Sequence, residues 1–248
     1  MNTRRCQVGR VVSLVVALAT LVLSAGLTAS AGTWLVVDSS TGVQGVGNDV
    51  YYITTPVSGW CTFSGNGNPS TTATWVWKNA TWNNAPANDT AEFRRIFTIP
   101  SGATVLVANL RYRVDNFGWV KVNGTTFVNL QLGDCPEAWP GGPREGCWSC
   151  AAWGDVWNTP ELRNAILVGA QNELRWYVKN SDSTPSSPAG AIIRLEIYYN
   201  RPPTAQNDSY TTQEDTPLIV SAPGVLGNDS DPDGDTLTVV LVSPPSDG

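Results

Sequence analysis

The chain has 248 residues, with 15 lysines and arginines, 21 acidic residues and no histidine. The absence of histidine excludes Ser-His-Asp and Cys-His nucleophile machinery as well as histidine-ligated zinc. The formal net charge is −6, and it becomes −9 (12 basic against 21 acidic residues) without the N-terminal segment that carries three arginines. Nucleic acid and anionic membrane surfaces are therefore unfavourable partners.

Residues 1–31 have the three parts of a secretory signal peptide. Arginines precede an apolar run over 11–27, and the small residues Ala-Ser-Ala follow it. A run of this length with an Ala-x-Ala end is typical of a cleaved signal rather than a retained anchor. The sequence thus predicts a secreted chain that begins near Gly32 and has no membrane insertion after cleavage.

Short alternating runs rich in β-branched and aromatic residues follow one another from Thr33 to Asn200, with Gly, Pro and Asn between them. Such runs are typical of strands. Strands are predicted at 33–38, 51–57, 60–63, 72–77, 91–99, 105–113, 119–127, 174–179 and 192–199. About ten short strands at near-regular spacing favour a two-sheet β-sandwich. One helical turn is expected where Thr159-Pro160 begins a short segment.

The stretch 111–127 is predicted to form an antiparallel meander at the centre of this domain. Its residues alternate up to Asp115, bend at 116–118, and alternate again in two runs separated by Asn123-Gly124. Asn-Gly supplies the positive backbone angles of a two-residue hairpin turn. Asn123 is therefore interpreted as a turn residue rather than as a ligand.

Four cysteines remain after signal cleavage, and an even count in an exported protein predicts two disulfides with three alternative pairings. They are Cys61, Cys135, Cys147 and Cys150. A four-cysteine zinc site is the alternative, because Cys147-Trp-Ser-Cys150 has ligand-like spacing. Disulfides are preferred, since Cys61 and Cys135 form no second such pair and export disfavours free thiolates.

Residues 133–158 show neither the hydrophobic period of a strand nor that of a helix, so they are predicted to form a loop. A loop of this length is usually functional, disulfide-held or both. The candidate ligand-binding residues are its four tryptophans, because exposed indole faces can stack on the apolar faces of sugar rings. These are Trp139, Trp148, Trp153 and Trp157. For any single one of them, packing around the crosslinks is the preferred interpretation.

Four acidic residues on the same loop raise the question of a glycosidase, which needs only two carboxyl groups at a set separation. They are Asp134, Glu137, Glu145 and Asp155. Nothing in their spacing singles out a pair. The sequence therefore predicts no enzyme.

Several of the predicted strands together resemble the galactose-binding-domain-like jelly-roll fold. The segments are ATWVW (73–77), EFRRIFTIP (92–100), ANLRYRVDNFGWVKVNG (108–124), LVGAQNELRWYVKN (167–180) and IIRLEIYY (192–199). The resemblance implies a jelly-roll β-sandwich over 32–200. It leaves carbohydrate binding, protein contact and a structural role open, because one fold hosts many functions.

Beyond a linker at 201–206, residues 207–248 resemble the cadherin-like tandem repeats of large bacterial surface proteins. The motifs EDTPL, GVLGND and DPDGDTLT carry this resemblance. It implies a partial Ig- or cadherin-like β-sandwich repeat, since such repeats are usually longer, and an N-terminal fragment of a longer extracellular protein.

The same tail contains alternating carboxylates, Asp229, Asp231, Asp233 and Asp235. Alternate carboxylates beside a glycine can gather several oxygens around Ca²⁺, and the resemblance favours calcium over a plain Asp/Gly turn. The segment is not an EF-hand, because Val240 stands at the position of the bidentate glutamate.

The sequence as a whole predicts an all-β, non-catalytic, secreted module for adhesion or carbohydrate attachment at a bacterial cell surface. The alternative is the accessory region of a secreted polysaccharide hydrolase. A carbohydrate or another cell-surface ligand is the expected partner.

Overall fold

The computed structural model describes residues 11–15, 32–53, 73–130, 152–180, 186–187, 189–213 and 216–240. For 11–15, 130, 152–154 and 186–187 only the backbone is described. The described chain consists mostly of antiparallel strands, with one six-residue α-helix. The all-β prediction is confirmed.

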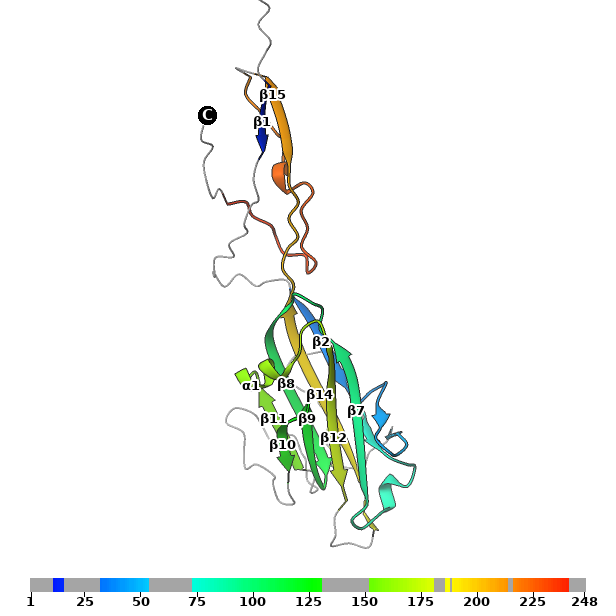
Figure 1. Ribbon diagram of the computed structural model, residues 1–248. Helices are drawn as coiled ribbons and strands as arrows, with labels where there is room; N and C mark the ends of the chain where they lie inside the picture. Colours follow the sequence, from blue (N-terminus) through cyan, green and yellow to red (C-terminus); the bar gives the residue numbers. More distant parts are fainter. Residues whose placement is uncertain are drawn as a thin grey trace, which may run out of the picture. The chain divides into compact units, whose positions relative to one another are not determined.

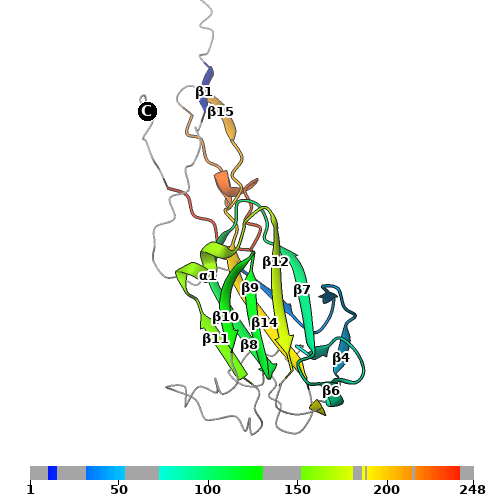
Figure 2. The ribbon, with the colours of Figure 1, turned by 60° about the horizontal axis from the view of Figure 1, so that its bottom comes forward.

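The residues Thr33–Asn200 form one compact unit built on two antiparallel sheets (Figure 1, Figure 2). In spatial order the first sheet contains β10 (Thr125–Leu130), β9 (Phe117–Val122), β12 (Gln171–Lys179), β7 (Thr90–Thr98) and β3 (Gln44–Gly45). The second contains β11 (Ala152–Trp157), β8 (Thr104–Asp115), β14 (Gly190–Asn200), β5 (Trp75–Trp77) and β4 (Tyr51–Ile53), and β2 (Thr33–Asp38) pairs with β14. The smaller elements are β6 (Ala85–Pro86), which pairs with β13 (Ser186–Ser187), the 3-10 turn η1 (Trp82–Asn84), and α1 (Pro160–Ala165).

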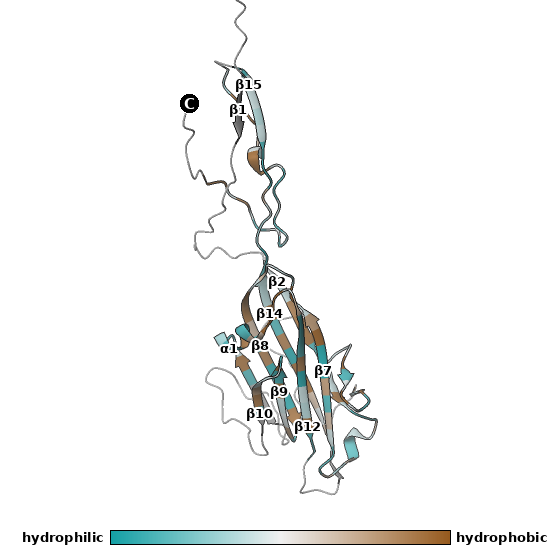
Figure 3. Cartoon of the chain, viewed as in Figure 1, coloured by the Kyte–Doolittle hydropathy of each residue, from teal (hydrophilic) through white to brown (hydrophobic). Residues whose placement is uncertain are grey.

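The core lies between the two sheets and follows from the period of two along each strand. In β9 and β12 every second side chain is buried, and the alternation of apolar and polar residues along the strands is visible in Figure 3. Trp75, Trp77 and Trp176 are fully buried, and the ring of Trp176 packs 5.7 Å from that of Phe93. Burying each such side chain contributes about 1.5–3 kcal/mol to folding.

The predicted meander is wrong in its pairing. Strands β8 and β9 are consecutive in the chain, yet they belong to different sheets, because the chain crosses from one sheet to the other at Asn116. Alternation in the sequence shows which side chains face the core but not which strands pair. The crossing is fixed by a hydrogen bond between the sheets, which the Tyr112 hydroxyl donates to the carbonyl oxygen of Tyr177 at 2.7 Å.

The hairpin from β9 to β10 is confirmed. Val122 faces Thr125 across the turn, and Asn123 and Gly124 have φ angles of 47° and 84°. Two successive positive φ angles define the turn type that Asn-Gly favours. Asn123 is therefore turn chemistry, as its sequence context indicated.

The predicted helical turn is also confirmed, as α1. Thr159 caps it, since its hydroxyl accepts a hydrogen bond from the backbone N–H of Leu162 at 3.2 Å, and Pro160 occupies the first helical position.

One strand was missed by the sequence analysis. The sequence predicts an irregular loop over 133–158, but residues 152–157 form β11 at the edge of the second sheet, paired with β8 from Asn109 to Val114. Gly154 and Asp155 have low strand propensity, so the local pattern concealed a strand that pairing with β8 stabilises.

The second unit comprises Met1–Gly32 and Arg201–Gly248. Within it β1 (Val11–Val15), which lies in the predicted signal segment, pairs with β15 (Ser209–Gln213), and a 3-10 turn η2 covers Gly224–Leu226. In the part of the chain that the structure describes, no helix is long and apolar enough to cross a membrane.

Candidate functional site

The outward face of β9 and β12 carries aromatic rings and cationic side chains in matching positions. Phe117, Trp119 and Lys121 alternate with buried residues on β9, and Arg175, Tyr177 and Lys179 do so on β12. The antiparallel register pairs Phe117 with Lys179, Trp119 with Tyr177 and Lys121 with Arg175. We refer to these six residues as the aromatic–lysine face.

The rings of Trp119 and Tyr177 form the centre of this face. They stack with 5.6 Å between centroids and 7° between planes. The Lys121 ammonium lies 4.5 Å from the centroid of Trp119, and the Lys179 ammonium lies 5.5 Å from that of Phe117. Both rings of the stack are half-buried, so the apolar surface of the face reaches solvent.

The charges on and beside the aromatic–lysine face are unequally compensated. The outward residues of β7, β9 and β12 include four cations and two carboxylates, which leaves a local net charge of +2 in a chain of net charge −6. Glu92 accepts from Arg175 Nε at 2.7 Å, and Glu173 lies 3.6 Å from Arg94. Among the described residues, no carboxylate lies within ion-pair distance of Lys121 or Lys179. The lysines therefore carry the uncompensated charge.

The protonation of two residues on the face follows from their surroundings. The hydrogen bond to Glu92 raises the pKa of Arg175. Burial raises the pKa of Tyr177, with a smaller contribution from the Glu92 charge, while the Thr90 hydrogen bond lowers it. The Tyr177 hydroxyl is consequently protonated near neutral pH and can donate a hydrogen bond.

The outward face of the second sheet is different, because the arginines of β8 and β14 are largely buried and paired with carboxylates. Arg113 donates to Asp155 through Nη1 at 2.6 Å and Nη2 at 3.3 Å, and Arg111 Nε lies 3.8 Å from the same carboxylate. Arg194 Nε lies 2.8 Å from Glu196. Asp155, one of the four loop acids, is thus bound to two arginines and serves as their counter-ion.

The structure describes few of the predicted site residues. Trp139, Trp148, the four cysteines Cys61, Cys135, Cys147 and Cys150, and the acids Asp134, Glu137 and Glu145 lie outside the described residues. For Trp153 only the backbone is described, paired with Arg113. Trp157 is 37 % exposed, with the Arg111 guanidinium 5.6 Å from its ring centroid.

Two other aromatic residues near the predicted site are excluded as contact surface. Tyr112 and Trp176 are fully buried in the core. Neither ring is therefore accessible to a ligand.

The acidic turn in the second unit is organised by internal hydrogen bonds. Asp231 Oδ1 accepts from the backbone N–H groups of Asp233 and Asp235 at 2.8 and 3.1 Å. Asp229 accepts from the N–H of Gln206 at 2.8 Å, and the buried carboxylate of Asp233 lies 2.8 Å from Arg201 Nη2. Within the described ranges, no three acidic, cysteine or histidine side chains converge on a metal position. Calcium binding by Asp229, Asp231, Asp233 and Asp235 stays a prediction.

The sequence pattern of the two strands indicates the aromatic–lysine face only in part. The segments FGWVK (117–121) and RWYVK (175–179) both alternate a buried residue with an aromatic or cationic one. Only the register between β9 and β12 shows that the two outward sets lie side by side.

Comparison with known proteins gives one family match. Residues 200–248 match the model described as Bacterial Ig domain. No curated protein matches the chain. The second unit from Arg201 onward is therefore similar to bacterial Ig domains, which agrees with the predicted Ig- or cadherin-like repeat.

Solved structures of glycosidases share distant similarity with the chain. A putative β-galactosidase from Bacteroides fragilis is 13 % identical, with a TM-score of 0.32, and the match covers 66 % of this chain and 24 % of that one. Faecalibacterium prausnitzii β-glucuronidase is also 13 % identical, with a TM-score of 0.33, and the match covers 86 % of this chain and 41 % of that one. A glycosyl hydrolase family 2 member from Bacteroides cellulosilyticus is 12 % identical, with a TM-score of 0.30, and the match covers 65 % of this chain and 21 % of that one. The chain thus spans less than half the length of these proteins, and TM-scores of this size do not establish a shared function.

Proposed function

We propose that this chain is a non-catalytic carbohydrate-binding module of an extracellular bacterial protein, and that it binds through the aromatic–lysine face. The observation that carries the proposal is the stack of Trp119 and Tyr177 on the outward face of the first sheet, with 5.6 Å between ring centroids.

A stacked pair of rings on a sheet suits a sugar chain better than a compact ligand. The C–H groups on one side of a pyranose form an apolar patch that packs against aromatic surface, while its hydroxyls need donors and acceptors nearby. Lys121 and Arg175 supply donors on one side of the stack, and Lys179 supplies donors on the other. A linear polysaccharide can use all of these groups along the two strands.

The non-catalytic part of the proposal is supported by the role of Asp155. A retaining or inverting glycosidase needs two carboxyl groups free to reach the glycosidic bond. Asp155 is instead 10 % exposed and bound by Arg113. The bacterial Ig match at 200–248 supports an extracellular setting.

Binding of this kind would serve either a surface adhesin or a polysaccharide hydrolase, the two settings that the sequence predicts. We propose adhesion as the main setting and the hydrolase as the alternative, because the tail resembles repeats of bacterial surface proteins. Attachment of the chain to whole cells or to plant and microbial polysaccharides, compared side by side, distinguishes a host-directed adhesin from a substrate-targeting module.

Affinity electrophoresis of the chain in gels that contain neutral or acidic polysaccharides tests the proposal. We expect at least one polysaccharide to retard the chain, and Trp119→Ala and Tyr177→Ala to abolish the retardation. Trp34→Ala is the matched control, because Trp34 is 51 % exposed but lies on β2 of the other sheet. Equal loss in the Trp34 variant, or no retardation by any polysaccharide, would show that the face does not bind carbohydrate.

A further inference from the structure

We infer that the aromatic–lysine face selects anionic polysaccharides, namely chains whose sugars carry carboxylate groups. This inference rests on the proposed function and specifies its ligand class. It starts from the distribution of lysine: the chain has three lysines, and Lys121 and Lys179 both belong to this face.

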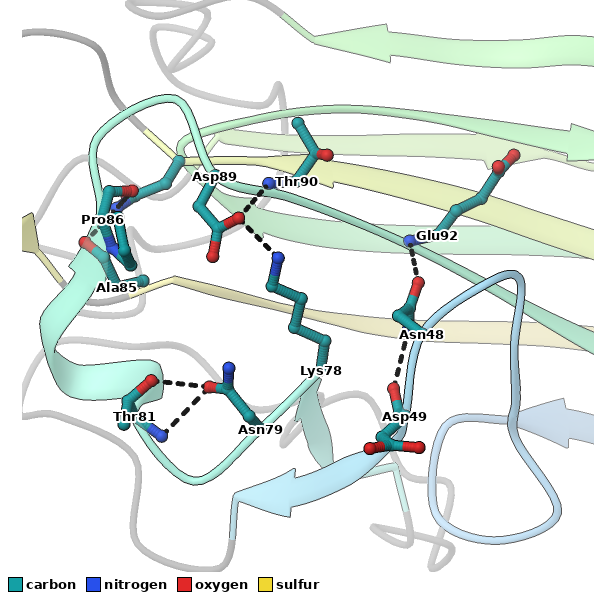
Figure 4. A network of polar contacts seen from close by, with 11 residues as sticks. Asn48, Asp49, Lys78, Asn79, Thr81, Ala85, Pro86, Asp89, Thr90 and Glu92 are labelled. Atoms are coloured by element: carbon teal, nitrogen blue, oxygen red, sulfur yellow. Dashed lines mark hydrogen bonds and ion pairs between the residues drawn. The ribbon is translucent and has the colours of Figure 1, made fainter.

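The two lysines are held in place without being neutralised by any carboxylate of the described residues. Each ammonium lies over an aromatic ring, at 4.5 Å for Lys121 and 5.5 Å for Lys179. A cation over a ring keeps most of its N–H donors, because the ring occupies one side of the ammonium only. The third lysine, Lys78, also lies near a ring, that of Trp77 at 5.9 Å, but its ammonium is paired with Asp89 (Figure 4).

The position of Lys121 favours a charged sugar over a neutral one. A neutral pyranose that stacks on Trp119 has to compete with the ammonium for the surface of the ring. A sugar acid meets the same competition, but its carboxylate can accept from Lys121 and so compensates for it. Such charge-assisted hydrogen bonds are about twice as strong as neutral ones.

The separation of the two lysines favours a repeating anion. Lys121 pairs with Arg175, and Lys179 stands four residues further along β12. Four residues of a strand span roughly 13 Å, at about 3.3 Å per residue. Successive charged sugars of one chain can meet both lysines over this distance.

The charge density of the face favours a polysaccharide over a nucleic acid. The local net charge is only +2, and Glu92 and Glu173 lie among the cations. Duplex DNA carries one negative charge for about every 1.7 Å and would be repelled by these carboxylates and by the acidic chain. A polyuronate with about one charge per sugar is better matched.

The test compares two forms of one polysaccharide, polygalacturonate and its fully methyl-esterified form, which differ in charge but not in backbone. Isothermal titration of the whole chain should give binding to polygalacturonate that is about tenfold tighter than to the ester and that weakens with added NaCl. The double variant Lys121→Gln, Lys179→Gln should remove this preference. Its affinity for polygalacturonate should fall about tenfold, and its affinity for the ester should change little.

Lys78→Gln is the matched control, because it removes the same charge from the lysine that Asp89 already neutralises. It should leave both affinities unchanged. Equal affinity for the two forms, with Trp119→Ala abolishing both, would overturn the inference and leave the proposed function intact. Loss of the preference in Lys78→Gln, or duplex DNA binding as tight as polygalacturonate binding, would also overturn it. Binding to neither form nor to any other polysaccharide would refute the proposed function itself.

Discussion

The Tyr112 hydroxyl donates a hydrogen bond to the backbone carbonyl of Tyr177 at 2.7 Å, and this contact joins the two sheets of the sandwich. Tyr112 is fully buried, whereas the Tyr177 ring belongs to the aromatic–lysine face. Tyr177 thus links the core, through its carbonyl, to the candidate binding surface, through its ring.

Removal of this hydrogen bond should destabilise the fold. Tyr112→Phe removes the hydrogen bond that joins the two sheets, at a cost of about 0.5–1.5 kcal/mol in the free energy of unfolding. Gly118→Ala should cost at least as much, because a Cβ there would overlap with the Tyr112 hydroxyl and the Tyr177 carbonyl oxygen. Urea unfolding followed by tryptophan fluorescence measures both. Tyr51→Phe is the control, since Tyr51 is 39 % exposed; an equal loss there would contradict the assignment.

Stability should also depend on alkaline pH through Tyr112. Burial raises the pKa of Tyr112 well above 10.0 in the folded chain. The unfolded chain therefore releases the proton first, so stability is full below pH 10.0 and falls as the pH rises above it, by up to about 1.4 kcal/mol per pH unit for this group. Tyr112→Phe should reduce the slope of the unfolding free energy between pH 10 and 11. An unchanged slope would show that the hydroxyl ionises as readily in the folded chain.

Asn123 and Asn172 should be energetically coupled. Asn123 Nδ2 donates to Asn172 Oδ1 and to the Ala165 carbonyl, both at 2.7 Å, and Asn172 is buried with further bonds to the backbone of Leu167. Asn172→Ala removes the bonds to Asn123 Nδ2 and to the backbone N–H and carbonyl of Leu167, and should cost about 2–3 kcal/mol. A double-mutant cycle with Asn123→Ala should give a coupling of at least about 0.5 kcal/mol. Asn129→Ala, an exposed position on β10, should change stability little; additivity in the cycle would argue against the coupling.

Asp155 should act on stability and not on hydrolysis. Asp155→Asn removes the negative charge that pairs with the guanidinium of Arg113, whose side chain is 6 % exposed, which should cost about 3–5 kcal/mol. Glu161→Gln on the exposed surface of α1 is the control. Thermal unfolding measures the effect. A stable Asp155→Asn variant that loses a measurable glycosidase activity would restore the catalytic interpretation.

The predicted calcium site is tested by adding Ca²⁺ to the whole chain. If Asp229, Asp231, Asp233 and Asp235 bind the ion as the sequence predicts, a free Ca²⁺ concentration of about ten times Kd should stabilise the second unit by about 1.4 kcal/mol. Asp229→Asn with Asp235→Asn should abolish the effect, and Mg²⁺ should not reproduce it. Absence of both binding heat and thermal shift would contradict the calcium prediction. The positive charge beside this turn would then come from Arg201, which forms an ion pair with Asp233.

Sequence patterns predicted the elements that depend on near neighbours. Asn123-Gly124 formed the expected hairpin, and Thr159-Pro160 began the expected helix, because turn and cap geometry is local. Pairing between distant strands was not predictable in this way. The crossing at Asn116 and the strand β11 both depend on partners far along the chain, and local alternation contains no information about them.

The candidate site shows the same division. The sequence directed attention to the tryptophans after Leu132, because their density is visible in one window. Trp119 and Tyr177 lie in different windows, and their stacking depends on the register between β9 and β12. A pair of strands that both alternate core residues with aromatic and cationic ones is the pattern that would have identified the face.

The scarcity of lysine has a practical consequence for work on this protein. Two of its three lysine amines stand on the proposed contact surface, and the third is paired with Asp89. Amine-reactive dyes and amine-coupled sensor chips would therefore modify the chain at the very place where a ligand is expected to bind. Labelling or immobilisation through a terminal tag keeps that surface open, and protection of Lys121 and Lys179 from acetylation by a bound glycan would itself map the contact.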